Sequence, residues 1–184
     1  MSISKFILTK VLGWHYKYDI PEDLNKFIIL AAPHTSIWDF AFGFFYCRAQ
    51  GKKLHVMIKK ESFFFPVGGL LKAMGGFPMD RENPQATMMR LIHEFENNDS
   101  YILAICPEGT RKPVHKWKTG YHTIATHAGV PVYMGYFDYA AKEVGLLPEP
   151  VEITADARKD TDRIQERYKE MNLTALHPEG YVTE

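Results

Sequence analysis

Apolar and polar residues alternate in blocks along the chain, and the blocks predict helices and strands in turn. Residues 2–13 gather apolar side chains on one side of a helix and predict an amphipathic N-terminal helix, which we place at residues 1–13. The next segment, 14–20, alternates strictly and predicts a half-buried strand that ends before Pro21. The continuous apolar run 27–32 predicts a strand in the interior of a sheet.

The same reasoning extends through the rest of the chain. Strands are predicted at residues 54–59, 76–79, 101–106 and 130–137, and a hairpin or a pair of strands at 142–154. Helices are predicted at residues 37–50, from Asn83-Pro84 onward, at 118–127 with Gly129 closing the helix, and at 160–173, the last within a C-terminal helical region placed at 160–177. We expect the final residues to form a tail. We therefore expect the α/β class, with residues 1–184 as a single domain built on a layered, mostly parallel or mixed β-sheet flanked by helices.

Composition is that of an ordinary globular domain and narrows the function. Hydrophobic residues make up 46% of the 184 residues and charged residues 24%, and the formal net charge is zero, whereas a nucleic-acid-binding domain would carry a basic excess. Cys47 and Cys106 lie in apolar runs without zinc-type spacing, so we expect small buried side chains and no metal. No run approaches the roughly 20 apolar residues that span a bilayer, and no signal peptide is evident. We expect any membrane contact to be peripheral.

Three polar clusters follow directly after predicted strands. They occupy residues 33–39 (PHTSIWD), 80–82 (DRE) and 107–111 (PEGTR). In open α/β sheets, ligands bind at the carboxyl ends of the strands. The sequence therefore predicts a site where these clusters meet.

His34 and Asp39 form the first candidate pair. A neutral imidazole is a suitable base for an alcohol near neutral pH, and a carboxylate on its other nitrogen would fix the tautomer. Five residues apart on one helix, the two side chains would face about 140° apart, so the pair requires His34 on a strand-to-helix turn and Asp39 in the first helical turn. Ser36 and Asp39 also fit a capping box, in which Asp39 would only serve the helix start.

The third cluster contains groups that suit an anionic ligand. Gly109 permits a tight turn with exposed backbone N–H groups, Thr110 adds a hydroxyl, and Arg111 can hold a phosphate through two parallel hydrogen bonds. Glu108 could orient an arginine or accept from a substrate hydroxyl, and Arg81 of the second cluster would be another cation. Solvated surface turns would explain the same residues.

Taken in order, the clusters resemble the motifs of the glycerolipid acyltransferase family, the lysophosphatidic acid acyltransferase-like enzymes. The segment from His34 to Asp39 resembles the first, His-x4-Asp motif, and Gly76 to Arg81 the second. Cys106 to Arg111 resembles the third motif, and Val130 to Val132 the fourth. The resemblance covers about residues 27–137, the motif-bearing core.

This resemblance implies roles for the residues and substrates for the protein. His34 would be the general base and Asp39 its partner, with no covalent acyl-enzyme. The acyl donor would be acyl-coenzyme A or acyl-acyl carrier protein, with no bound cofactor and no metal. The acceptor's phosphate or other polar head would be bound by Ser36, Lys59, Arg81, Glu108, Gly109, Thr110 and Arg111.

Two departures from the family keep other functions open. Pro33 stands where the family has Asn, and Cys106 stands where it has Phe. The acceptor could be 1-acylglycerol 3-phosphate or another lysolipid with an amino or sugar head. The same His34–Asp39 pair could instead hydrolyse a thioester, and a third alternative is a lipid-binding domain without catalysis.

The acyl acceptor implied by the resemblance resides in a membrane. We expect a cytoplasmic protein that associates peripherally with the inner face of the cell membrane. The N-terminal helix, with Lys5 and Lys10 near the lipid head groups, and the apolar segment 63–74 are the candidate contacts. Packing of both segments on the protein's own core is the alternative.

Overall fold

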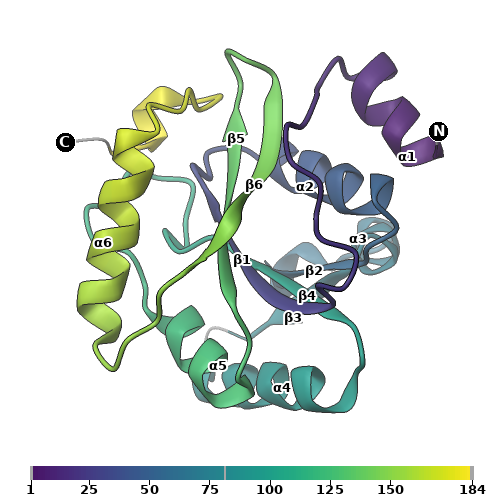
Figure 1. Ribbon diagram of the computed structural model, residues 1–184. Coiled ribbons are helices and arrows are strands. Elements are labelled where there is room, and N and C mark those ends of the chain that lie inside the picture. The colour runs from purple at the N-terminus through teal and green to yellow at the C-terminus, as the bar shows by residue number, and fades with distance from the viewer. Residues whose placement is uncertain (1, 81, 183–184) are drawn as a thin grey trace.

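Six strands form a single sheet in the computed structural model, which describes residues 2–80 and 82–182 (Figure 1). Along the sheet the order is β3-β2-β4-β1-β5-β6. The first five strands in sequence run parallel, and β6 pairs antiparallel with β5, so the sheet is mixed, as predicted. The strands are β1 (Lys26–Ala32), β2 (Leu54–Lys59), β3 (Gly76–Met79), β4 (Tyr101–Ile105), β5 (Val132–Asp138) and β6 (Glu143–Val151).

Helices cover both faces of the sheet (Figure 1). They are α1 (Ile3–Phe6), continued by a π-helical turn (Ile7–Val11), α2 (Trp38–Ala49), α3 (Val67–Ala73), α4 (Pro84–Asn97), α5 (Gly120–Ala128) and α6 (Ala157–Glu170), with short 3-10 turns at Lys60–Ser62 and Pro178–Gly180. The helices α4, α5 and α6 pack on one face, and the N-terminal helix and α2 pack on the other. Among the described residues, no helix has the length and apolar character needed to cross a membrane.

The central strand β1 explains how one sheet supports two cores. Its side chains point alternately to opposite faces. Ile28 and Leu30 join the core beneath α4, α5 and α6, whereas Phe27 and Ile29 join the core beneath α2. Because both faces are covered, β1 is apolar and buried from Phe27 to Ala32, which confirms the interior strand predicted at residues 27–32.

The predicted helix signals lie where the structure needs them. The Asn83 side chain accepts a hydrogen bond from the Ala86 N–H at 3.0 Å, and Pro84 occupies the first position of α4. Gly129 ends α5 with a φ of 62°, a left-handed conformation that glycine adopts without a steric penalty. These local signals confirm the predicted start of α4 and the glycine predicted to close α5, whereas α5 begins at Gly120 instead of residue 118.

The strand predicted at residues 14–20 is wrong. This segment makes one isolated bridge, from His15 to Glu143, and otherwise runs outside the sheet. Its alternation arises because one side of the segment packs on α2. The Trp14 ring stacks on Phe42, with their centroids 3.8 Å apart. An extended segment that packs one side on a helix therefore shows the same alternation of apolar and polar residues as a half-buried strand.

The last two predictions need correction at their boundaries. The hairpin or strand pair expected at residues 142–154 is the single strand β6, which forms a hairpin with β5. The helix expected at 160–173, within a region placed at 160–177, spans Ala157–Glu170 instead. Asn172 has a φ of 50°, so the helix cannot continue past it.

Candidate active site

Two of the three polar clusters meet at the carboxyl ends of the central strands. Residues 33–37 follow β1, and residues 106–111 follow β4, which pairs with β1 in parallel. The second cluster, 80–82, follows β3 at the edge of the sheet. Its predicted site residue, Arg81, lies outside the described residues.

The predicted His34–Asp39 pair is formed. The Nδ1 atom of His34 lies 3.1 Å from Oδ2 of Asp39, which occupies the first turn of α2. The same oxygen accepts from the backbone N–H groups of Thr35 at 3.0 Å and Ser36 at 2.9 Å. Asp39 therefore accepts hydrogen bonds from backbone N–H groups at the start of α2 and also contacts the His34 ring. The two roles considered for Asp39 from the sequence are thus compatible.

A tyrosine that the sequence reasoning missed completes this arrangement. The Tyr139 hydroxyl donates to the other carboxylate oxygen, Oδ1 of Asp39, at 2.5 Å. Burial, and next the hydrogen bond to the Asp39 carboxylate, raise the pKa of Tyr139, so its hydroxyl stays protonated at neutral pH. Tyr139 directly follows β5, in the same position relative to its strand as the three clusters. That position was the signal that could have identified it.

The second ring nitrogen of His34, Nε2, has no hydrogen bond comparable to that of Nδ1 among the described residues, although the Cys106 side chain lies near the ring. With the Nδ1–H donating to Asp39, the neutral ring carries its lone pair on Nε2. The side chain is 23% exposed, so a ligand can reach it. Burial lowers the pKa of His34, whereas its contacts with the Cys106 side chain and the Asp39 carboxylate raise it, and the net direction is upward, so Nε2 is a stronger base than in an ordinary histidine. The ring can therefore accept a proton on Nε2 while Asp39 stabilises the resulting cation.

Glu108 joins the third cluster to the first. Its Oε1 accepts from the His34 backbone N–H at 2.9 Å. The side chain is 6% exposed, and burial raises its pKa to about 7 although the bond from His34 opposes the shift. Its second oxygen, Oε2, is buried without a hydrogen bond from the described residues. Glu108 is thus a carboxyl group that is only partly ionised at neutral pH.

Three further predicted residues, Gly109, Thr110 and Arg111, lie in the turn that follows β4. Gly109 adopts a left-handed φ of 67° beside Glu108, and Arg111 is exposed two residues further on. The Thr110 hydroxyl oxygen accepts from the backbone of Lys112 at 3.2 Å.

Two other predicted residues, Ser36 and Lys59, lie outside the turn formed by residues 107–111. Ser36 is buried, and its Oγ accepts from the Trp38 N–H at 3.2 Å. Lys59 is exposed at the end of β2, which β4 separates from β1. Neither side chain is hydrogen-bonded to the His34 ring, and the roles of both as substrate-binding residues stay predictions.

The predicted tail lies beside the first and third clusters. The His177 backbone N–H donates to Oγ1 of Thr35 at 3.3 Å, and Thr174 accepts from the backbone of Tyr139 at 2.8 Å. Gly180 lies so close to Arg111 that a Cβ added there would be 2.9 Å from the arginine carbonyl oxygen. Residues 174–180 therefore form one side of the site. Their irregular backbone has no periodicity from which the sequence could reveal this.

Other candidate ligand sites are few among the described residues. A recess of about 150 Å³ lies where β2, β3 and β4 begin, at the opposite edge of the sheet, and none of the predicted site residues lines it. No group of three His, Cys, Asp or Glu side chains within residues 2–80 and 82–182 could hold a metal ion.

Comparisons with known proteins agree on one family. The family model described as Acyltransferase matches residues 15–137. The 1-acyl-sn-glycerol-3-phosphate acyltransferase of Streptococcus pneumoniae (strain ATCC BAA-255 / R6) is 31% identical over 99 residues, which are 53% of this chain and 36% of that protein. The chain thus matches about a third of the length of this curated relative.

The fold also has a solved counterpart. The crystal structure of the 1-acyl-sn-glycerophosphate (LPA) acyltransferase PlsC from Thermotoga maritima aligns with a TM-score of 0.58, covering 95% of this chain and 83% of that one. Sequence identity over that alignment is 18%, so the likeness concerns the fold alone.

Proposed function

The chain belongs to the acyltransferase family, and from this premise we propose that it transfers a fatty acyl group from a thioester to the hydroxyl of a lysophospholipid-like acceptor. The donor would be acyl-coenzyme A or acyl-acyl carrier protein. The favoured acceptor is 1-acylglycerol 3-phosphate, because the relative from Streptococcus pneumoniae is named for that substrate.

In the proposed reaction His34 is the general base. Its Nε2 takes the proton from the acceptor hydroxyl as the oxygen attacks the thioester carbonyl carbon. The tetrahedral intermediate then collapses, the carbon–sulfur bond breaks, and the imidazolium returns the proton to the leaving thiolate. The products are an ester and a free thiol. One observation carries this proposal: the ring that Asp39 orients from 3.1 Å leaves Nε2 open.

Asp39 and Tyr139 would hold the His34 imidazole in the orientation that it needs to reach the acceptor hydroxyl. The carboxylate fixes the Nδ1–H tautomer and stabilises the imidazolium during transfer. Two backbone N–H groups and the Tyr139 hydroxyl hold the carboxylate, and Asp39 is only 2% exposed. A base held by packing and hydrogen bonds loses little freedom when the acceptor binds.

The acceptor head would bind along the turn that follows β4. Arg111 is exposed and forms no ion pair with an acidic side chain among the described residues, so its guanidinium is available to a phosphate. Glu108 would accept from an acceptor hydroxyl or hold the His34 backbone. Arg81, Lys59, Ser36, Gly109 and Thr110 stay proposed as further parts of the acceptor site.

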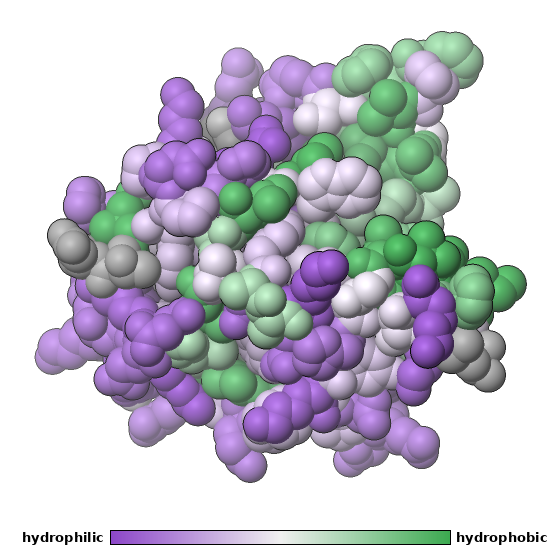
Figure 2. Space-filling model, turned by 90° about the horizontal axis from the view of Figure 1, so that it is seen from above, coloured by the Kyte–Doolittle hydropathy of each residue, from purple (hydrophilic) through white to green (hydrophobic). Residues whose placement is uncertain are grey.

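Peripheral membrane contact fits the surface of the molecule. Figure 2 shows apolar residues gathered over the side where Figure 1 places α1, α2 and α3. The large exposed apolar side chains on and beside these helices are Ile3, Phe6, Val11, Ile37, Trp38, Phe64, Phe65 and Leu70. Membrane-facing helices expose such side chains, and we propose that this surface meets the bilayer that holds the acceptor.

The test is an acylation assay with labelled acyl donor and a lipid extract, with the product identified by mass spectrometry. His34→Ala should lower the transfer rate by about 100- to 10,000-fold with an unchanged circular dichroism spectrum. A folded His34→Ala protein that keeps most of its activity would show that the base is misassigned.

The same assay separates transfer from thioester hydrolysis. Free thiol is measured with and without acceptor, using wild-type protein and His34→Ala. Transfer requires thiol release to depend on the acceptor. Release at an equal rate without any acceptor would identify a hydrolase that uses the same pair.

A further inference from the structure

The segment that joins β4 to α5 carries a lysine whose main chain is fixed. The backbone N–H of Lys118 donates to the carbonyl of Pro107 at 2.8 Å, which ties the end of the segment to its beginning. The preceding residue, Trp117, is buried, and its ring centroid lies 5.4 Å from that of Tyr168. An exposed lysine in this loop therefore has a defined origin for its side chain.

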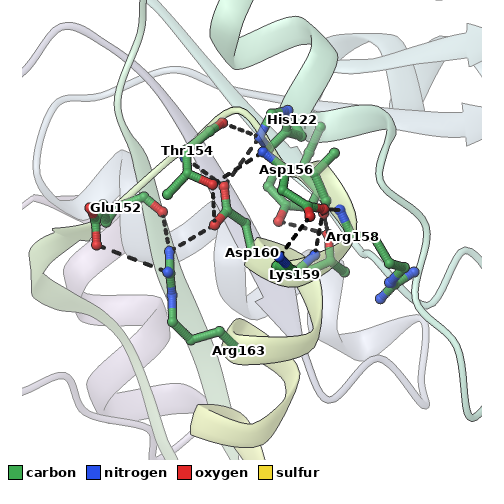
Figure 3. Close-up of polar contacts among 11 residues, drawn as sticks. His122, Glu152, Thr154, Asp156, Arg158, Lys159, Asp160 and Arg163 are labelled. Carbon is green, nitrogen blue, oxygen red and sulfur yellow. Dashed lines mark hydrogen bonds and ion pairs between the residues drawn. The ribbon is translucent and has the colours of Figure 1, made fainter.

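Helix α6 holds the same segment from outside. Arg158 donates to the carbonyl of Trp117 at 2.7 Å, and Gln165 donates to the carbonyl of His115 at 3.1 Å. Figure 3 shows that Arg158 belongs to a cluster of polar side chains at the start of α6. Asp160 of that cluster accepts from Thr154 and from His122 of α5. The helix and the loop are therefore held together by contacts at both ends of residues 115–117.

The Lys118 side chain lies on the turn of the third cluster. A Cβ added at Gly109 would be 2.9 Å from the Lys118 Nζ and 2.8 Å from its Cε. Glycine at position 109 allows the φ of 67° and leaves the space in which the end of the Lys118 side chain lies. The ammonium group rests beside the residue that follows Glu108.

Among the described residues, no acidic side chain pairs with this lysine. Neither Lys118 nor Arg111 forms an ion pair with an acidic side chain in the part of the chain that the structure describes. The nearest acid in sequence, Glu108, is buried and faces the His34 backbone. Lys118 and Arg111 therefore border the turn without an ion pair to any acidic side chain of residues 2–80 and 82–182.

We propose that Lys118 is a further phosphate-binding cation of the acceptor site, beside Arg111, and sets its preference for phosphate-bearing acceptors. The proposal rests on the proposed function. Arg111 can bind two phosphate oxygens with its planar guanidinium, and the Lys118 ammonium supplies a compact charge for a third. Both groups border the turn whose neighbour, Glu108, is bonded to His34, so a phosphate held there places its lipid near the base.

Kinetics with two matched acceptors test the assignment. In Lys118→Gln, the KM for 1-acylglycerol 3-phosphate should rise about tenfold or more while kcat stays within about threefold, because a charge-assisted hydrogen bond is lost from binding. The KM for monoacylglycerol, which lacks the phosphate, should not change. Lys118→Arg should restore most of the affinity, and Lys116→Gln, at an exposed lysine two residues earlier, should behave as wild type.

Acyl-coenzyme A also carries phosphates, so its KM is measured in parallel. An increase confined to the donor KM would overturn the assignment to the acceptor. Equal losses with the phosphate-bearing and phosphate-free acceptors would overturn it as well, as would an unchanged KM in Lys118→Gln.

A binding measurement separates this inference from the reaction itself. Titration calorimetry with glycerol 3-phosphate requires no turnover. Weaker binding to Lys118→Gln than to wild type and Lys116→Gln supports the phosphate site even if no acceptor is acylated, in which case the proposed function alone fails. Equal binding to all three proteins, or no binding to wild type, overturns the inference.

Discussion

At the scale of single residues, the hydroxyl of Tyr139 offers a test of how the base is held. Tyr139→Phe removes one hydrogen bond to the buried Asp39 carboxylate and leaves the ring packing intact. We expect kcat to fall about tenfold with little change in KM, because a hydrogen bond to a charged group contributes about 1.5–3 kcal/mol. Steady-state kinetics measure both constants. The control is Tyr133→Phe, at a buried tyrosine whose hydroxyl forms no hydrogen bond with the described residues, and it should keep wild-type kcat.

The carboxyl of Glu108 gives a stability prediction that depends on pH. Burial raises its pKa to about 7 from an ordinary 4.5, so between these values the unfolded chain loses a proton that the folded chain retains. Stability must therefore fall as pH rises through this window. Glu108→Gln removes the effect, and we expect it to be more stable than wild type at pH 8 by up to about 3 kcal/mol, the value of a shift from 4.5 to about 7.

Thermal melts of both proteins at pH 4 and pH 8 measure this difference. The melting temperature of Glu108→Gln relative to wild type should be higher at pH 8 than at pH 4. The variant should also transfer acyl groups more slowly than wild type. A difference in melting temperature that is the same at both pH values would contradict the assigned pKa direction.

The site residues differ in how far their partners lie along the chain. His34 and Asp39 are five positions apart, so the geometry of a strand-to-helix turn was sufficient to predict their contact. Tyr139 reaches Asp39 across 100 positions, and no local pattern encodes that distance. The sheet brings them together, because β1 and β5 are neighbours and both end at the same edge.

At the scale of elements, the start of α6 depends on one buried carboxylate (Figure 3). Asp160 accepts from the backbone and hydroxyl of Thr154, lies 3.2 Å from His122, and pairs with Arg163 at 3.0 Å. Asp160→Asn should cost about 2–4 kcal/mol, because it leaves these donors partly unpaired in a buried site. Urea denaturation measures the loss, and Glu166→Gln, at an exposed pair on the same helix, should cost less than about 1 kcal/mol.

Elements with a strong local signal were predicted well, and the errors have a common cause. β2 and β3 occupy their predicted residues, because apolar strands bounded by polar residues have few alternatives. The segment 14–20 has the pattern of a strand but only one bridge. Periodicity reports which side chains are covered, and it does not report whether a sheet or a helix covers them.

At the scale of the whole molecule, the sheet order determined which predicted clusters could form one site. β1 lies between β4 and β5, so the residues that follow these strands are neighbours, whereas β3 ends at the sheet's edge. The sequence supplied the clusters, and the family resemblance supplied their roles. Neither could supply the contribution of residues 174–180, whose place depends on where α6 leaves the sheet.

The exposed apolar surface leads to the last prediction, which concerns how the molecule reaches its acceptor. Leu8 is fully buried in the core beneath α2, so deleting residues 1–13 would damage the fold as well as any docking surface. Ile3, Phe6 and Val11 on the same helix are 80%, 48% and 64% exposed, and replacing all three with Asn leaves Leu8 in place.

Each of these side chains would contribute roughly 1 kcal/mol or more on entering the interface, so the triple variant should bind anionic liposomes at least about tenfold more weakly in a flotation assay. Met89→Asn changes an exposed apolar residue on α4, on the opposite face, and should float as wild type does. Equal flotation of the triple variant and wild type would show that the helix does not dock. Loss in both variants would indicate nonspecific adsorption, since only one of the two faces can meet the bilayer.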